Sequence, residues 1–144
     1  MRETRNNHRR RRKGSITLEA AMVFPLLLTI FFVTIEFSWM FYVRHTISNA
    51  AREGARVAII PGSTTAEVNA AVESAVRRGG LNSASYSHAL TSGGSAVGSL
   101  DSVAGGSQVT VEITAPWSQF SVFNSGFGVW GNDITAEATM RREG

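Results

Sequence analysis

The side chains that could carry out catalysis are few in this sequence and stand far apart. His8, His45 and His88 match no metal-binding spacing, and the chain has no cysteine. Its serines lie in no Gly-x-Ser-x-Gly turn, and its glycine pairs lack the Gly-Lys-Ser/Thr ending of a phosphate-binding loop. We therefore expect no enzymatic activity, no catalytic residue, no metal and no cofactor.

Two carboxylates bracket the most apolar part of the chain. Glu19 stands directly before it, and Glu36 lies about 25 Å further along if the segment is helical. That separation excludes a general acid/base pair. Because a carboxylate that loses its water must be paired or protonated, Glu19 is the acid for which we expect a function. Glu36 is expected near a membrane surface, where a charge costs little.

Residues 20–43 contain Glu36 as their only charge and are apolar on every side. A helix of about 20 apolar residues crosses a bilayer, so we expect a membrane span, with a buried core helix as the less favoured alternative. Seven basic residues within residues 1–13 keep the N-terminus cytoplasmic and send the C-terminal domain outside. At the outer interface of the span, an aromatic belt is expected from Trp39, Phe41 and Tyr42, and Arg44 is expected to snorkel to the headgroups.

The net charge of +3 and the pI of about 10.2 come from this N-terminal arm. Outside residues 1–13 the acidic side chains outnumber the basic ones. The arm has no interleaved aromatic residues and no folded basic surface to support it. We therefore expect no nucleic-acid partner.

The junction at the start of the apolar run reads RRRRKG, SITLE, AAMVFPLLL, and it resembles the processing site of type IV prepilins and pseudopilins. The resemblance implies a basic leader, residues 1–14, that a prepilin peptidase removes by cutting between Gly14 and Ser15. It also implies that the Glu19 carboxylate pairs with the new α-amino group of Ser15, its own or a neighbour's, during assembly. Such pairing would neutralise two charges in a filament core of low dielectric.

A second resemblance narrows the family. The stretch from Ile35 to Ala58 resembles the signature of TadE-like proteins, minor pseudopilins of the tight-adherence (Flp, type IVc) pilus systems. The matching positions are Pro25 within the apolar run and the signature residues Glu36, Phe37, Arg52, Glu53, Gly54 and Arg56. Residues 134–143 resemble the family's last strand. Ala20 follows Glu19 where Flp-type pilins carry Tyr and TadE-like proteins often Phe, which argues against a major pilin, as does the length of the chain.

The helical elements follow from spacing and capping. Residues 15–60 are predicted to form one long helix, transmembrane over 20–43 and then amphipathic, with Pro25 as its kink. Its second half has a smooth face of small and apolar residues: Ile47, Ala50, Ala51, Gly54, Ala55 and Ala58. The Arg-Glu-Gly-Ala-Arg block is either a solvated helix face or a contact surface for the C-terminal domain or another subunit. Thr64 and Glu67 predict a capped second helix over 65–78.

The rest of the exported part, residues 61–144, is predicted to hold a small antiparallel sheet. Residues 108–115 alternate polar and apolar and should pair with residues 134–140, and weaker strand candidates lie at 84–90 and 97–103. An aromatic loop joins the two better strands, and a core lid, a membrane contact and a subunit contact all remain open for it; its aromatic residues are Trp117, Phe120, Phe123, Phe127 and Trp130. The fold class is thus α+β and pilin-like.

The leading hypothesis is a TadE-like minor pseudopilin that, after leader cleavage, takes part in assembling a tight-adherence pilus or a related secretion apparatus. Its expected partners are a prepilin peptidase, other pilins or pseudopilins, the inner-membrane assembly platform and the lipid bilayer. It would lie in the cytoplasmic membrane as a single-pass protein, and its incorporation into the pilus is left open. The alternative is an unprocessed single-pass anchor whose outer domain binds cell-envelope partners.

Overall fold

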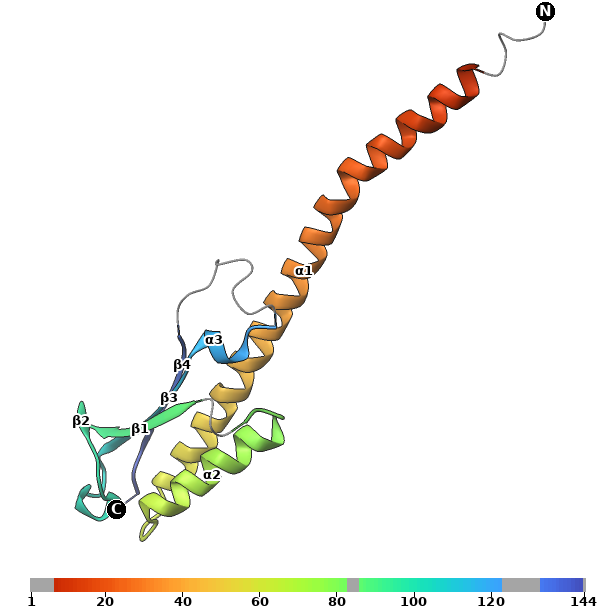
Figure 1. Cartoon of the computed structure of the whole chain (residues 1–144). Coiled ribbons are helices and arrows are strands. Elements are labelled where there is room, and N and C mark those ends of the chain that lie inside the picture. Colours follow the sequence, from red (N-terminus) through yellow and green to blue (C-terminus); the bar gives the residue numbers. More distant parts are fainter. Residues whose placement is uncertain (1–6, 83–85, 123–132, 144) are drawn as a thin grey trace, which may run out of the picture. The chain divides into compact units, whose positions relative to one another are not determined.

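A computed structural model describes residues 7–82, 86–122 and 133–143 of the chain, with side chains from Ile16 onward (Figure 1). The chain divides into two compact units, residues 1–38 and residues 39–144. The fold is α+β, as the sequence predicts: a long N-terminal apolar helix, a second short helix and a four-stranded antiparallel sheet.

Helix α1 spans Asn7–Ala58 and runs through both units. It begins eight residues before the predicted start at Ser15, because the arginines of the leader are good helix formers. It passes through Pro25 as continuous helix, and the Thr29 hydroxyl donates to the Pro25 carbonyl at 2.8 Å. The kink at Pro25 stays a prediction.

Helix α2 spans Thr65–Arg78, the predicted range. Its capping box is formed in both directions: the Glu67 N–H donates to the Thr64 hydroxyl at 3.3 Å, and the Thr64 N–H donates to the Glu67 carboxylate at 2.8 Å. Val68, Val72 and Val76 form its buried stripe. The capping prediction is thus confirmed, and it fixes where the second helix begins.

The sheet has the strand order β2-β1-β3-β4, with every neighbouring pair antiparallel. The strands are β1 Ser87–Ser92, β2 Ser95–Ala96, β3 Gln108–Ala115 and β4 Ile134–Arg141. Gly93 and Gly94 form the β1–β2 turn with φ of 59° and 82°, a left-handed conformation that favours glycine. The predicted pairing of residues 108–115 with residues 134–140 is confirmed.

The two weaker strand predictions fare differently. β1 overlaps only the end of the candidate at residues 84–90, and part of that candidate lies outside the described residues. The strand predicted at residues 97–103 is wrong: Leu100–Ser102 form a 3₁₀ turn, η2. The Leu100 side chain is buried, and its carbonyl accepts a hydrogen bond from the Arg142 guanidinium, so the segment is anchored by a turn and not by strand pairing.

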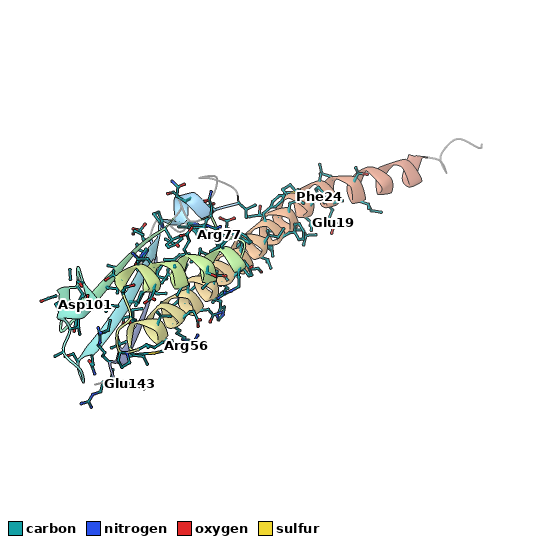
Figure 2. The ribbon with its side chains drawn as sticks, turned by 90° about the horizontal axis from the view of Figure 1, so that it is seen from below. Glu19, Phe24, Arg56, Arg77, Asp101 and Glu143 are labelled. Carbon is teal, nitrogen blue, oxygen red and sulfur yellow. The ribbon has the colours of Figure 1, made fainter. Side chains whose placement is uncertain are left out.

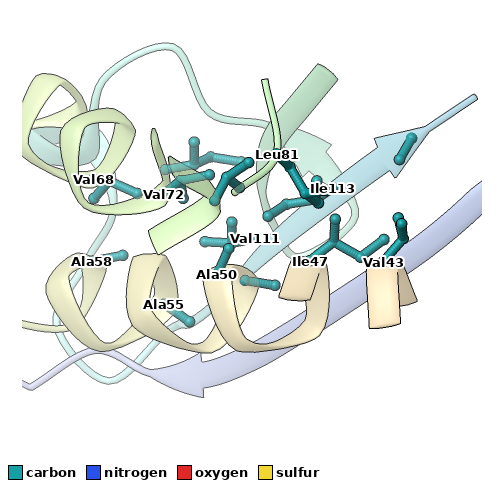
Figure 3. Packing of buried hydrophobic residues seen from close by; sticks show 14 of the residues in the cluster. Val43, Ile47, Ala50, Ala55, Ala58, Val68, Val72, Leu81, Val111 and Ile113 are labelled. Carbon is teal, nitrogen blue, oxygen red and sulfur yellow. The ribbon is translucent and has the colours of Figure 1, made fainter. Parts of the chain in front are cut away.

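The core lies between one face of the sheet and two helices, α2 and the second half of α1 (Figure 3). All six small and apolar residues predicted for the α1 face are buried, and five of them belong to the same core cluster as Val111 and Ile113 of β3, the sixth being Gly54. The close approach depends on Gly54, where a Cβ atom would stand 2.5 Å from Cγ2 of Val72 on α2. The other face of the sheet is polar, with Thr110 and Thr139 hydrogen-bonded across β3 and β4 at 2.7 Å.

The short helix α3, Trp117–Phe120, follows β3 and begins the aromatic loop. Trp117 and Phe120 are both buried and belong to the core, so the core-lid interpretation is confirmed for these two residues. Phe123, Phe127 and Trp130 lie outside the described residues.

Candidate functional site

The first candidate region is the apolar part of α1 within the unit of residues 1–38. Its large side chains are exposed, for example Leu18 at 68% and Met22 at 76%. From Ile16 onward the helix is long and apolar enough to cross a membrane, and none of its most apolar stretch is buried. A helix of this kind satisfies its exposed apolar surface only in lipid or in an assembly of similar helices.

The polar side chains of this stretch bond within the helix itself. The hydroxyls of Thr29, Thr34 and Ser38 each donate to the carbonyl four residues earlier, all at 2.8 Å. In lipid an unsatisfied hydroxyl costs free energy, and this back-bonding removes the cost. These three hydroxyls therefore meet a main requirement of a membrane-spanning segment, which is that its polar groups find partners within the protein.

Gly14, Ser15 and Glu19 lie on one continuous stretch of α1 backbone. Ser15 and Glu19 are four residues apart, so they stand one turn apart on the same side of the helix. The Glu19 side chain is exposed, and Figure 2 shows it projecting from α1. The backbone thus brings residue 15 and the Glu19 carboxylate within one helical turn, about 6 Å of helix rise.

The signature residues of the later part of α1 divide between surface and core. Gly54 is buried against α2 and β3, whereas Arg52 and Arg56 are exposed. Arg56 forms a salt bridge with Glu53 at 2.9 Å between Nη2 and Oε1. The hydrogen bond from Arg56 lowers the pKa of Glu53, and the same bond raises the pKa of Arg56. One block therefore serves both predicted purposes: Gly54 contacts the C-terminal domain and the charged side chains form a solvated face.

Glu36 and Phe37, the acidic-aromatic pair, lie in the last turns of the first unit. Glu36 is half-buried and Phe37 is 37% exposed. Trp39 follows them as the first residue of the second unit. The pair therefore stands where the apolar helix meets the folded domain in the chain.

Two residues of the predicted aromatic belt have partners that the sequence does not reveal. The Trp39 indole N–H donates to the Phe120 carbonyl at 2.6 Å, and the Tyr42 hydroxyl donates to the Gly79 carbonyl at 2.9 Å. The two rings stack with centroids 5.3 Å apart. Sequence reasoning missed both bonds because the acceptors are backbone carbonyls 81 and 37 residues away, which no side-chain pattern marks. Trp39 and Tyr42 thus hydrogen-bond to the ends of α3 and α2 within their own unit, and both remain partly exposed at its surface.

The part of the chain that the structure describes holds no cluster of three or more His, Asp or Glu side chains suited to a metal ion. His88 instead shares a hydrogen bond of 2.9 Å with the Asn69 amide oxygen. A groove of about 350 Å³ lies beside β4 and is lined by acidic and basic side chains, among them Arg44, Glu112 and Glu137. Glu112 and Glu137 are directly opposite on β3 and β4.

The described residues contain one helix that is long and apolar enough to span a membrane, and a small α+β domain follows it. This arrangement is that of a membrane-anchored protein. The model of the TadE-like protein family matches residues 14–56 of this chain. The predicted resemblance to TadE-like pseudopilins of the tight-adherence pilus system is thereby confirmed, and it supports a role related to this pilus. No curated protein and no solved structure matches the chain.

Proposed function

We propose that this protein is a minor pseudopilin that, once its leader is removed, takes part in assembling a tight-adherence pilus or a related secretion apparatus. The observation that carries the proposal is the TadE-like match, which begins at Gly14 and continues through the whole apolar helix to Arg56. Its first residue is thus the glycine after which cleavage is proposed. Residues 1–13, which carry the seven basic side chains of the leader, lie outside the match.

In this proposal a prepilin peptidase cuts between Gly14 and Ser15. The backbone from Asn7 to Ser15 is helical, and a peptidase must bind its scissile bond in an accessible conformation. Glycine inside a helix destabilises it by about 0.5–1 kcal/mol relative to alanine, so Gly14 is the position where this stretch unwinds most easily. Gly14 then supplies both a small residue for the peptidase and a weak point in the helix.

Cleavage would create an α-amino group one helical turn from Glu19. Both charges would enter an apolar environment when the helix joins others, and each charge alone would be strongly destabilised there. Pairing them, within one chain or between neighbours, removes most of that cost. Glu19 would then select processed subunits, because an unprocessed chain has no amino group at this position.

The proposal is tested by replacing Gly14 with leucine in cells that contain an active prepilin peptidase. We expect the precursor to accumulate uncleaved in the membrane fraction and to be absent from pilus-associated complexes. A matched variant, Gly98→Leu, changes a glycine outside the leader where a Cβ atom meets nothing within 4 Å, and it should be cleaved normally. Cleavage of the Gly14 variant at the usual rate would contradict the proposed site, and function without any cleavage would favour the unprocessed anchor.

A further inference from the structure

The Trp39 end of the C-terminal unit brings together three segments that are far apart in the sequence. The bond from Trp39 to the Phe120 carbonyl attaches the end of α3, and the bond from Tyr42 to the Gly79 carbonyl attaches the end of α2. Gly79 also lies against Thr46, since a Cβ atom at Gly79 would stand 2.2 Å from Cγ2 of Thr46. The ends of α2 and α3 therefore lie beside the first turns that α1 makes in this unit.

The surface at this end combines apolar and aromatic side chains with the exposed Arg77 and Arg78 of the last turn of α2. Phe41, Tyr42 and Val122 are 44%, 46% and 52% exposed, and Trp39 is half-buried beside them. We call these four residues the Trp39 collar. Tryptophan and tyrosine are enriched where a protein meets the headgroup layer of a membrane. Arg44 lies five residues beyond Trp39 along the same helix and lines the groove beside β4.

At the opposite end of the unit, where α1 ends, charged side chains are exposed. The Glu143 N–H donates to the Ile59 carbonyl, and the Arg142 guanidinium donates to the Leu100 carbonyl, so the C-terminus and η2 gather where α1 ends. Asp101, Arg56 and Glu143 are exposed there, and Figure 2 shows them at one end of the domain. This charged end lies about 30 Å along α1 from Trp39. The unit therefore carries exposed apolar and aromatic side chains beside the basic last turn of α2 at one end, and side chains of both charges without such a cluster at the other.

The hydrogen bonds of the collar allow its rings to leave water. A buried indole N–H or phenol O–H needs an acceptor, and Trp39 and Tyr42 already have theirs in the Phe120 and Gly79 carbonyls. The rings can therefore enter the apolar side of a membrane interface without an unsatisfied donor. Val122 has no polar side-chain group to satisfy.

We propose that the Trp39 collar docks the folded C-terminal unit onto the outer headgroup layer of the membrane that α1 spans. The occupant is lipid because the collar begins at Trp39, the residue that directly follows the exposed apolar stretch of α1 in the chain, and because its rings are of the kind that gathers at membrane interfaces. This inference rests on the membrane span in the proposed function. It adds that the unit is held at the membrane by the ends of α2 and α3 as well as by the helix.

The natural absence of cysteine allows the depth of single residues to be measured on the full chain. Single variants Phe31→Cys, Val122→Cys and Asp101→Cys would carry an environment-sensitive fluorophore in vesicles of phosphatidylethanolamine and phosphatidylglycerol. Lipids with a nitroxide in the headgroup region quench fluorophores near the interface. We expect blue-shifted emission at residues 31 and 122, strong headgroup quenching at residue 122, and neither effect at residue 101.

The outcomes separate this inference from the proposed function. If the residue 31 label is in lipid but the residue 122 label is as water-exposed as that at residue 101, the docking is overturned while the membrane span stands. If residue 122 is shielded from water but not quenched by lipid nitroxides, a protein covers the collar and the lipid assignment is overturned. A water-exposed label at residue 31 overturns the span and the docking together.

A second variant tests the part played by Trp39. Trp39→Phe in the Val122→Cys chain keeps an aromatic ring but removes the N–H that holds the Phe120 carbonyl. We expect a several-fold loss of headgroup quenching at residue 122, with emission at residue 31 unchanged. Unchanged quenching would overturn the role given to this hydrogen bond in setting the depth of the α3 end.

Discussion

Gly54 of α1 lies so close to Val72 of α2 that a Cβ atom at position 54 would stand 2.5 Å from the Val72 Cγ2 atom. The same Cβ would lie 3.4 Å from Val111 of β3, so the glycine sits where the two helices and the sheet meet. Gly54 belongs to the TadE-like segment and is at the same time buried against the core residues Val72 and Val111. The packing requirement gives a physical reason for glycine in the Arg-Glu-Gly-Ala-Arg block.

Gly54→Ala should therefore destabilise the C-terminal unit. Either the valine or the helices must move to admit one methyl group, and overpacking of this kind costs about 1–3 kcal/mol. Gly98→Ala is the matched control, because a Cβ there meets nothing within 4 Å. Thermal unfolding of the detergent-solubilised full chain measures both variants. An equal melting temperature for the two would contradict the packing account.

Thr64→Ala should remove the side-chain half of the α2 capping box. The Glu67 N–H would lose its acceptor, and loss of an N-cap of this type costs about 1 kcal/mol. The control is Ser74→Ala in the exposed part of the same helix, which should change the stability by less than about 0.5 kcal/mol. Denaturant unfolding followed by circular dichroism compares them. If both variants unfold like the natural chain, the cap does not stabilise α2.

The Glu53 to Arg56 salt bridge should make stability depend on acid pH. The folded pKa of Glu53 is lowered by the hydrogen bond from Arg56, so its contribution is present above its ordinary pKa of 4.5 and is lost as the pH falls through the lower folded value. The pair is exposed, so the effect should be small and weakened by salt. Melting temperatures of the natural chain and of Glu53→Gln should converge toward low pH. Parallel curves across this range would count against the pair.

Glu19→Gln should leave cleavage intact but weaken assembly. The variant keeps the size of the side chain and loses the charge that pairs with the α-amino group, so a processed subunit would bury that amino group alone. Glu36→Gln is the matched control, because it removes a carboxylate from the same helix away from the N-terminus. Crosslinking to pilus components in cells should fall for the first variant only. Equal crosslinking of both would remove the pairing role from Glu19.

Local patterns predicted much of the fold because their physical causes are local. The capping box at Thr64 and the alternation of Val109, Val111 and Ile113 depend only on near neighbours, and both elements form where they were expected. The segment around Leu100 has no such pattern, and its turn is held by Arg142 from the end of the chain. The bond from Trp39 to Phe120 was likewise unpredictable, because its acceptor is a main-chain carbonyl that any residue could supply.

The candidate functional residues likewise include some that sequence patterns predicted and some whose surroundings only the structure showed. The acidic-aromatic pair and the Arg-Glu-Gly-Ala-Arg block within residues 35–58 are a sequence pattern, so the resemblance to TadE-like proteins could be predicted from them, and the family match at residues 14–56 confirms it. The two functions of the Arg-Glu-Gly-Ala-Arg block became separable only when the structure placed Gly54 in the core and left Arg52 exposed. Packing partners, unlike motifs, are set by the tertiary fold.

The central claim is that the chain is a processed pseudopilin, and the N-terminus of the protein extracted from membranes tests it most directly. Mass spectrometry should find a chain that begins at Ser15, without the seven basic residues of the leader. The same measurement in cells without prepilin peptidase should find the intact precursor. A chain that still carries residues 1–14 in cells with an active peptidase would contradict the account.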